Sequence, residues 1–368
     1  MGNLRISEWR KLPSFRWKKL RGDEWVCVLQ GRILCLKQDS SHLHYQTIRP
    51  NNAYPITPPS SAAASKVGTP SDGGDDTESL LRHYLNLTPD LTALYEYWSS
   101  LDSNFKRRAP KFTGVRILKQ DAWEALVGFI CSHIDEQPFH DFPPPDALTG
   151  PGVESHLREL GFGYRAGYIA KTAKIVANER PAGWLHNLCN PAVFDASLDD
   201  KALPEGGREG YRKAHEELLQ LQGVGPKVAD CVCLMGLGWG ESVPVDTHVW
   251  QIAQRDYKFG KGKHKSLTKA TYDAVGNHFR SLWGKEAGWA HSVLFAADLK
   301  TFSERLTKKI EVDFKEVEIK QEDGSVLESK IAVKREYTLD DVKEEVDEGK
   351  AGILIESSRT QRAKRRRI

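Results

Sequence analysis

The chain has 368 residues, of which 39% are hydrophobic and 28% are charged, so it is long enough for two or three domains with a large core. Lys and Arg number 53 against 50 Asp and Glu, and this near balance alone argues little for a nucleic-acid partner. The six scattered cysteines are typical of reduced intracellular thiols. Without a secretory leader or an apolar run of roughly 20 residues, the sequence predicts a soluble protein with no membrane partner.

A small antiparallel sheet is predicted at the N-terminus. Residues 25–36 have the pattern of two strands joined by a Gln-Gly turn, and residues 42–48 have the pattern of a third strand. Residues 51–76 are dense in Pro, Ser, Ala and Gly, which indicates a loop insertion. We assign this sheet domain to residues 1–112.

The apolar spacing becomes helical from about residue 80 onward. Helices are expected over residues 91–98, 122–132, 154–160, 168–177, 215–221, 226–235, 272–282 and 288–299. The predicted fold class is therefore α+β, with the small sheet domain preceding a mainly α-helical body over residues 113–302.

The remaining residues, 303–368, form a charged tail. Residues 308–348 mix Glu, Asp and Lys with few aromatic residues, which is typical of disorder. The six Lys and Arg residues within 359–367 are typical of a nuclear-import signal or of a non-specific phosphate contact. We therefore expect a nuclear protein, and basic residues among the first dozen leave a mitochondrial fraction open.

A glycine hairpin is the most informative local pattern. Gly223 and Gly225 bracket Val224, and glycine adopts positive φ at little cost. Pro226 suits the first position of the helix that follows. Backbone amides at such a helix start form a cradle for phosphate. An ordinary packing corner between two helices has the same pattern, and Gly-x-Gly alone does not separate the two interpretations.

Two reactive side chains accompany the hairpin. Lys227 opens the second helix, and Asp246 follows 19 positions later (246 − 227), just after an extended Val-Pro-Val. A neutral lysine amine forms Schiff bases, and a carboxylate facing a cleft stabilises positive charge on a sugar ring. Cys231 shares a helix face with Lys227 at i+4. Taken singly, a solvated lysine and an N-cap aspartate are the simpler interpretations.

Together these residues resemble the helix–hairpin–helix DNA glycosylase superfamily. The run Gly-Val-Gly-Pro-Lys-Val-Ala-Asp-Cys-Val-Cys-Leu-Met and the later Val-Pro-Val-Asp-x-His are similar to the eukaryotic 8-oxoguanine DNA glycosylase/lyase branch, and the similarity extends from about Ser14 to about Leu299. The resemblance implies an N-glycosylase (a hydrolase) with class I AP lyase activity in base excision repair. Its substrate would be double-stranded DNA with 8-oxoguanine or formamidopyrimidine opposite cytosine, bound by a monomer.

The resemblance also implies residue roles. Lys227 matches the amine that attacks the sugar C1′ and forms a Schiff base, and Asp246 matches the carboxylate that supports the transition state. The base pocket would comprise Cys231, Met235, His291 (where many relatives have glutamine) and Phe295. The residues that contact DNA would be Tyr164, Arg165, Gly223, Val224, Gly225 and His248. No cofactor is required. The carbonyls of Leu219, Leu221 and Val224 match positions that hold a structural cation. No cysteine follows Cys233, which predicts that no iron–sulfur cluster forms.

Two segments of the family pattern are missing. Relatives carry Gly-Gln before Ser-Phe-Arg-Trp, and the carbonyl of that glycine accepts the N7 hydrogen of 8-oxoguanine. In this chain Leu12-Pro13 precedes Ser14 instead. The strand that usually lies upstream is not recognisable in the sequence. After Ser132 relatives continue through an asparagine run that contacts the opposite cytosine, whereas here His133 follows. We expect the catalytic pair to survive with weakened lesion discrimination and opposite-base reading. A catalytically impaired, damage-binding isoform is the alternative.

Overall fold

The computed structural model describes residues 2–5, 16–20, 24–39, 42–49, 76–131, 141–191, 203–260 and 266–299. The chain separates into two units, Met1–Leu306 and Thr307–Ile368. The second unit, which contains most of the predicted tail and its basic cluster, lies outside the described residues.

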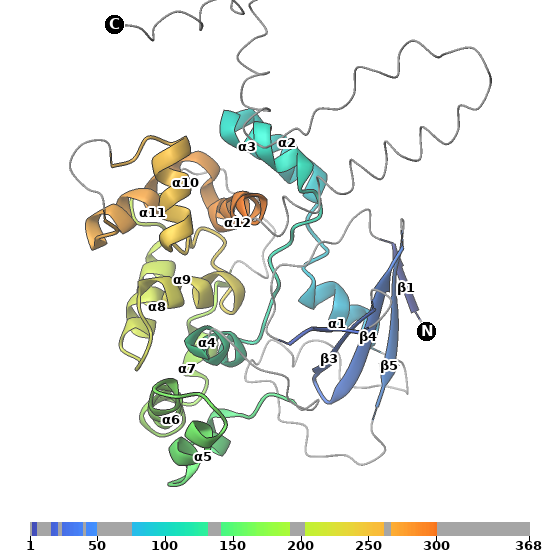
Figure 1. Cartoon of the computed structure of the whole chain (residues 1–368), viewed down its shortest axis with the longest axis vertical. Helices are drawn as coiled ribbons and strands as arrows, with labels where there is room; N and C mark the ends of the chain where they lie inside the picture. The colour runs from blue at the N-terminus through green and yellow to red at the C-terminus, as the bar shows by residue number, and fades with distance from the viewer. Residues whose placement is uncertain are drawn as a thin grey trace, which may run out of the picture. The chain divides into compact units, whose positions relative to one another are not determined.

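The N-terminal sheet has five antiparallel strands (Figure 1). In spatial order they are β1 (Gly2–Arg5), β5 (His42–Ile48), β4 (Arg32–Gln38), β3 (Glu24–Leu29) and β2 (Lys18–Lys19). The predicted hairpin and third strand are confirmed as β3, β4 and β5. The predicted insertion at residues 51–76 lies, apart from its last residue, outside the described residues.

The β3–β4 hairpin turns at Gln30 and Gly31, whose φ angles are 50° and 71°. Two successive positive φ angles match the right-handed twist of a hairpin. Along β4, burial alternates, so that Leu34 and Leu36 face the core and pack with Leu81 of α1 (Thr77–Tyr84). The sheet therefore buries one face against the first helix, as its alternating sequence predicts.

The expectation that no strand precedes Ser14 is wrong. Strand β1 pairs with β5 over four residues, with Leu4 opposite Leu43. Such a short edge strand depends on main-chain bonds to a partner about forty positions away. No alternation within four residues can reveal it, because the pairing is not local.

The body is helical, which confirms the α+β class. Its helices are α2 (Leu91–Leu101), α3 (Ser103–Arg108), α4 (Ala122–Cys131), α5 (Val153–Glu159), α6 (Arg165–Lys174), α7 (Trp184–Asn187), α8 (Glu209–Leu219), α9 (Pro226–Met235), α10 (Thr247–Asp256), α11 (Lys269–Trp283) and α12 (Ala287–Asp298). Among the described residues, no helix has both the length and the apolar character needed to cross a bilayer.

Helix α9 lies between two buried clusters. Leu234 belongs to a cluster rich in aromatic residues from α2, α3, α11 and α12, whereas Val232 and Cys233 belong to a second cluster with α4, α6 and α8. Close packing on both sides restrains a helix far more than packing on one side. The helix that begins at Pro226 is consequently fixed on two faces, which makes it a rigid support for any side chain in its first turn.

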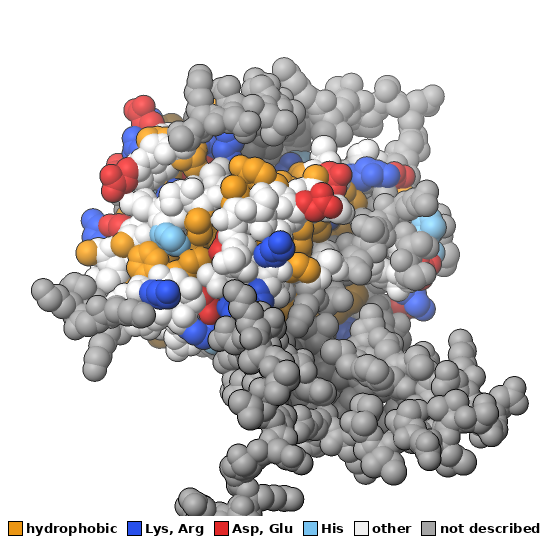
Figure 2. All heavy atoms as spheres, turned by 90° about the horizontal axis from the view of Figure 1, so that it is seen from above, with side chains coloured by type: hydrophobic (Ala, Val, Ile, Leu, Met, Phe, Trp, Pro, Cys, Tyr) orange, Lys and Arg blue, Asp and Glu red, His pale blue; other side chains and the backbone are white. Residues whose placement is uncertain are grey.

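Arg16 joins the sheet to the helical body. Its guanidinium donates to the Val28 carbonyl on β3 and to the Glu124 carboxylate on α4. Burial raises the pKa of Glu124 to about 7, and the charge of Arg16 acts against that rise. Residues 12–15 and 132–140, where the two family segments are missing, lie outside the described residues. The face shown in Figure 2 intermixes apolar, basic and acidic side chains.

Candidate active site

The glycine hairpin connects α8 to α9, which lie side by side (Figure 1). Gly223 has φ 78°, and a Cβ there would lie 2.6 Å from the Tyr168 ring. The predicted positive φ is therefore confirmed for Gly223. Gly225 instead has φ −94° and ψ 177°, because this residue is the extended N-cap of α9.

Gly225 leaves the start of α9 open. It provides no side chain to cap the helix, and a Cβ built on it would meet nothing within 4 Å. Pro226 takes the first helical position, as predicted. The amides of the first turn thus remain available to an anion that approaches the backbone closely. The Thr172 hydroxyl donates to the Gln222 carbonyl at 3.0 Å and holds the hairpin against α6.

Lys227 is half-buried in the first turn of α9. Its Nζ lies 5.5 Å from the centroid of the Phe129 ring on α4, within the range of a cation–π contact. Among the described residues, Lys227 forms no ion pair with Asp246. Sequence analysis missed Phe129, because α4 is apolar on nearly every face and nothing distinguishes this ring from a core residue.

Cys231 is 4% exposed and lies one turn below Lys227. Burial raises the pKa of its thiol to about 12, while the charge of Lys227 and a hydrogen bond with it act in the opposite direction. Asp246 also acts on this thiol electrostatically and raises its pKa. The structure thus brings the predicted lysine, cysteine and aspartate into one electrostatic environment.

Asp246 is the N-cap of α10, as predicted, and its Oδ1 accepts a hydrogen bond from the Val249 amide at 2.8 Å. One carboxylate oxygen therefore holds the helix start, and the other is available for chemistry. The next-but-one residue, His248, is exposed, and its ring lies 6.1 Å from that of Phe295 in an edge-to-face arrangement.

His291 and Phe295 of α12 complete one side of the site. The ring of His291 is buried, and neither of its nitrogens makes a well-aligned hydrogen bond among the described residues, although a contact with the Gly288 backbone acts to raise its pKa. Burial lowers the pKa of His291 to about 4, although Asp246 acts to raise it. The His291 ring lies 6.5 Å from that of Phe295. Phe295 and Met235 both pack against the buried cluster that is rich in aromatic residues from α2, α3, α11 and α12. A neutral imidazole, one donor and one acceptor, therefore lies within electrostatic range of the Asp246 carboxylate.

Tyr164 and Arg165 lie at the start of α6. Tyr164 is 69% exposed, and its ring lies 5.8 Å from that of Tyr168, which covers Gly223. Arg165 stacks 5.7 Å from the Tyr164 ring and donates to the Cys131 carbonyl at the end of α4. An exposed aromatic side chain supported by a second ring thus flanks the hairpin.

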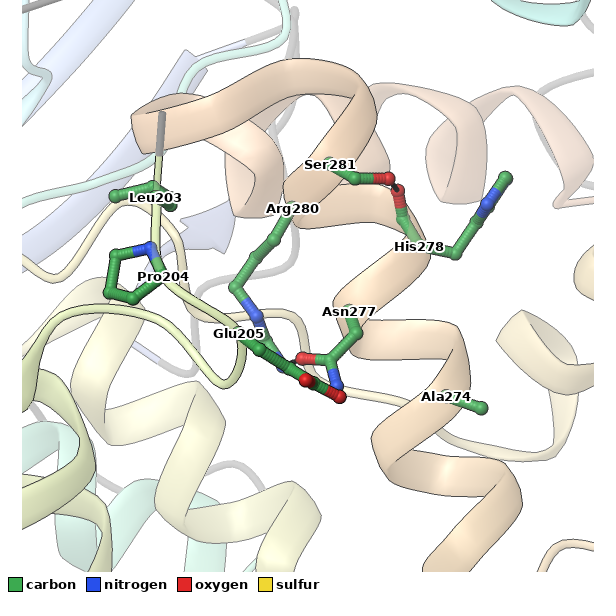
Figure 3. A pocket seen from close by; sticks show the side chains of 8 residues that line it. All are labelled: Leu203, Pro204, Glu205, Ala274, Asn277, His278, Arg280 and Ser281. Carbon is green, nitrogen blue, oxygen red and sulfur yellow. Dashed lines mark hydrogen bonds between the residues drawn. The ribbon is translucent and has the colours of Figure 1, made fainter. Parts of the chain in front are cut away.

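A cavity of about 430 Å³ lies elsewhere, between the loop at Leu203 and helix α11 (Figure 3). Its walls carry Leu203, Pro204, Glu205, Ala274, Asn277, His278, Arg280 and Ser281. None of the predicted site residues lines it, so this cavity is not the candidate active site.

Two family models match the chain. Residues 13–126 match the model described as 8-oxoguanine DNA glycosylase, N-terminal domain. Residues 118–277 match the model described as HhH-GPD superfamily base excision DNA repair protein. The second match spans the hairpin, Lys227 and Asp246, and the first spans strands β2 to β5 of the sheet.

Curated relatives match over most of their lengths. An N-glycosylase/DNA lyase of Saccharomyces cerevisiae is 35% identical over 265 residues, which cover 61% of this chain and 67% of the relative. The N-glycosylase/DNA lyase OGG1 of Arabidopsis thaliana is 30% identical over 312 residues, which cover 78% of this chain and 74% of the relative.

Solved structures share the fold. The 8-oxoguanine glycosylase/lyase of Clostridium acetobutylicum in its apo form has a TM-score of 0.55 at 20% identity, over 77% of this chain and 88% of that one. The same enzyme bound to double-stranded DNA with cytosine opposite the lesion has the same TM-score at 20% identity, over 77% and 87%. The hairpin, the lysine at its exit and the helical body define a helix–hairpin–helix DNA glycosylase. Within that class, the chain belongs to the 8-oxoguanine N-glycosylase/DNA lyase family.

Proposed function

We propose that this protein is a bifunctional DNA glycosylase and AP lyase that excises oxidised purines, such as 8-oxoguanine and formamidopyrimidine, from duplex DNA in base excision repair. The observation that carries the proposal is the placement of Lys227 in the first turn of α9, at the exit of the hairpin, with Cys231 one turn further along the same helix and Asp246 at the N-cap of α10. A hairpin that only packed two helices would require neither an amine nor a carboxylate there.

The reaction begins with extrusion of the damaged nucleotide, because an amine cannot reach a sugar carbon within the base stack. The Lys227 amine attacks C1′ as the bond to the base breaks, and the base leaves with the bonding electrons. Asp246 stabilises the positive charge that grows on the sugar. Loss of the amine protons and opening of the sugar ring give a Schiff base. That imine acidifies the C2′ proton, whose removal breaks the C3′–oxygen bond.

The pocket side chains suit an extruded purine. Phe295 offers an aromatic face and Cys231 a soft, protonated thiol, which are the kinds of side chain on which a flat ring stacks. The buried nitrogens of His291 lack well-aligned partners among the described residues, and buried polar groups gain most from a ligand that supplies hydrogen bonds. The exposed Tyr164 fits the role of a wedge that fills the space left in the stack.

DNA would approach along the hairpin. The open N-terminus of α9 at Gly225 can accept a phosphate, and the exposed His248 and the half-buried Arg165 can contact the strands nearby. The Leu221 carbonyl accepts only a long bond of 3.4 Å from Val224, and a carbonyl has a second lone pair. The carbonyls of Leu219, Leu221 and Val224 therefore fit a structural cation that would neutralise nearby phosphate charge.

We further propose that the protein acts as a monomer in the nucleus, with a mitochondrial fraction also open. The basic cluster that supports nuclear import lies outside the described residues. The two missing family segments support weakened lesion discrimination and opposite-base reading. If the purified protein excised 8-oxoguanine opposite cytosine with full selectivity over guanine, that part of the proposal would be wrong.

Borohydride trapping tests the activity. The full-length protein is incubated with duplexes that contain 8-oxoguanine, formamidopyrimidine or an abasic site opposite cytosine, and the Schiff base is reduced to a stable adduct. We expect an adduct with at least one of these lesions, and none with Lys227→Gln. Retained binding without any adduct would instead identify a damage-binding protein of the same fold.

A further inference from the structure

A buried carboxylate lies three residues after Lys227 and has no part in the chemistry described above. Asp230 is 1% exposed. It accepts hydrogen bonds from the hydroxyls of Tyr211 on α8 and Tyr272 on α11, and the Ser242 hydroxyl lies 2.8 Å from its Oδ1. His215 Nε2 lies 3.8 Å from its Oδ2. A buried carboxylate is tolerated only when such donors surround it, so this network fixes the position of α9.

The network extends from the lysine helix to the aspartate. The Tyr272 hydroxyl donates to Asp230 Oδ2 and also lies 3.4 Å from the backbone amide of Val245, which can donate to it. Val245 is 1% exposed and immediately precedes Asp246. The Tyr272 hydroxyl therefore joins the helix that carries Lys227 to the residue next to Asp246, and the Ser242 hydroxyl, 2.8 Å from both Asp230 Oδ1 and the Asp230 carbonyl, joins the same helix to that segment four residues earlier.

Tyr211 is a natural comparison. Its hydroxyl bonds to the same carboxylate, but within the described chain it makes no bond to the segment that leads to Asp246. Its ring faces α11 instead, where the Arg280 guanidinium lies 5.6 Å from the ring centroid and donates to the Asn277 side chain at 2.8 Å (Figure 3). Burial and the charge of Asp230 raise the pKa of both tyrosines, so both hydroxyls stay protonated as donors.

We propose that Tyr272 is a positioning residue for the reaction, because its hydroxyl, held between Asp230 and the Val245 amide, fixes the Lys227 amine relative to the Asp246 carboxylate. This inference rests on the proposed glycosylase and lyase function. Tyr272 contacts neither DNA nor the reacting atoms in this role. Its effect is geometric, and a misplacement of about 1 Å between reacting groups can lower a rate by up to about 100-fold.

The test compares three tyrosine-to-phenylalanine variants of the full-length protein. Tyr272→Phe removes the hydroxyl that connects Asp230 to the Val245 amide. Tyr211→Phe removes a different hydrogen bond to Asp230 and leaves the Tyr272 connection in place. Tyr257→Phe removes a similar buried hydroxyl that bonds to Asp102, away from the site. For each variant we measure the unfolding free energy, the dissociation constant for an uncleavable lesion duplex, and the single-turnover excision rate at saturating DNA across pH.

We expect Tyr272→Phe to excise about 10-fold more slowly at saturating DNA, with a dissociation constant within about twofold of the wild type. Tyr211→Phe and Tyr257→Phe should lose comparable stability and keep the wild-type rate within about twofold. A wild-type rate for Tyr272→Phe, or an equal loss of rate in Tyr211→Phe, would overturn the proposal. If the wild type itself forms no borohydride adduct, the proposed function fails instead, so the two failures are distinguishable.

Discussion

The two hairpin glycines should respond to alanine in opposite ways. In Gly223→Ala the new Cβ meets the Tyr168 ring at 2.6 Å, with the Cβ of Tyr168 itself at 2.9 Å, so a ring rotation alone cannot relieve the clash. The left-handed φ of 78° adds strain of roughly 1–2 kcal/mol, and overpacking adds roughly 1–3 kcal/mol. We therefore expect a loss of about 2–5 kcal/mol in the free energy of unfolding.

Gly225→Ala is the matched control. Its backbone is extended and its Cβ meets nothing within 4 Å, so the lower entropy of the unfolded chain and the preference for Gly over Ala at an N-cap oppose each other, and stability should change by less than about 1 kcal/mol. The methyl group would instead lie between the α9 amides and an approaching phosphate, and we expect about 10-fold weaker duplex binding, which corresponds to about 1.4 kcal/mol.

Urea unfolding of the full-length variants, followed by tryptophan fluorescence, gives the stabilities, and anisotropy with a labelled abasic-analogue duplex gives the affinities. The reasoning is refuted if Gly223→Ala unfolds at the wild-type urea concentration. It is equally refuted if Gly225→Ala binds the duplex as tightly as the wild type.

Two further predictions concern Asp246 and His291. Asp246→Asn keeps an oxygen that accepts the hydrogen bond from the Val249 amide, so its free energy of unfolding should change by less than about 0.5 kcal/mol. Its excision rate should fall by at least about 100-fold, because the negative charge is lost. Asp246→Ala should in addition lose about 1 kcal/mol of stability, and an active Asp246→Asn would contradict the role given to the carboxylate. The pKa of His291 in the folded protein is about 4, below its ordinary value of 6.5. As pH falls, the unfolded chain therefore takes up the proton before the folded protein does. The contribution of His291 to the free energy of unfolding is complete above pH 6.5 and is lost as pH falls towards 4. The loss should approach about 3 kcal/mol over that pH range in the wild type and be absent in His291→Gln. Urea unfolding at a series of pH values measures it, and identical pH profiles for the two proteins would refute this prediction.

Local patterns predicted the elements that depend on neighbours in sequence. The Asp246 cap, Pro226 at the helix start and the Lys227–Cys231 pair were predicted from spacing, and the structure places them as expected. Each of these features is decided within a few residues, because a helix brings positions i and i+4 together wherever it forms.

Features that depend on distant partners were not predicted. Strand β1 requires β5, and the bridge at Tyr272 requires Asp230, 42 positions away. The Gly-Val-Gly pattern does not say which glycine turns the chain. The Tyr168 ring against Gly223 settles that question, and it comes from another helix.

The most direct test of the central claim is the location of the covalent bond. After borohydride reduction of the wild-type protein on an abasic duplex, proteolysis and mass spectrometry identify the modified amine. The account predicts a single adduct on Lys227, absent from Lys227→Gln and formed more slowly in Asp246→Asn. An adduct on the chain's N-terminal amine or on another lysine, formed equally well by Lys227→Gln, would contradict it.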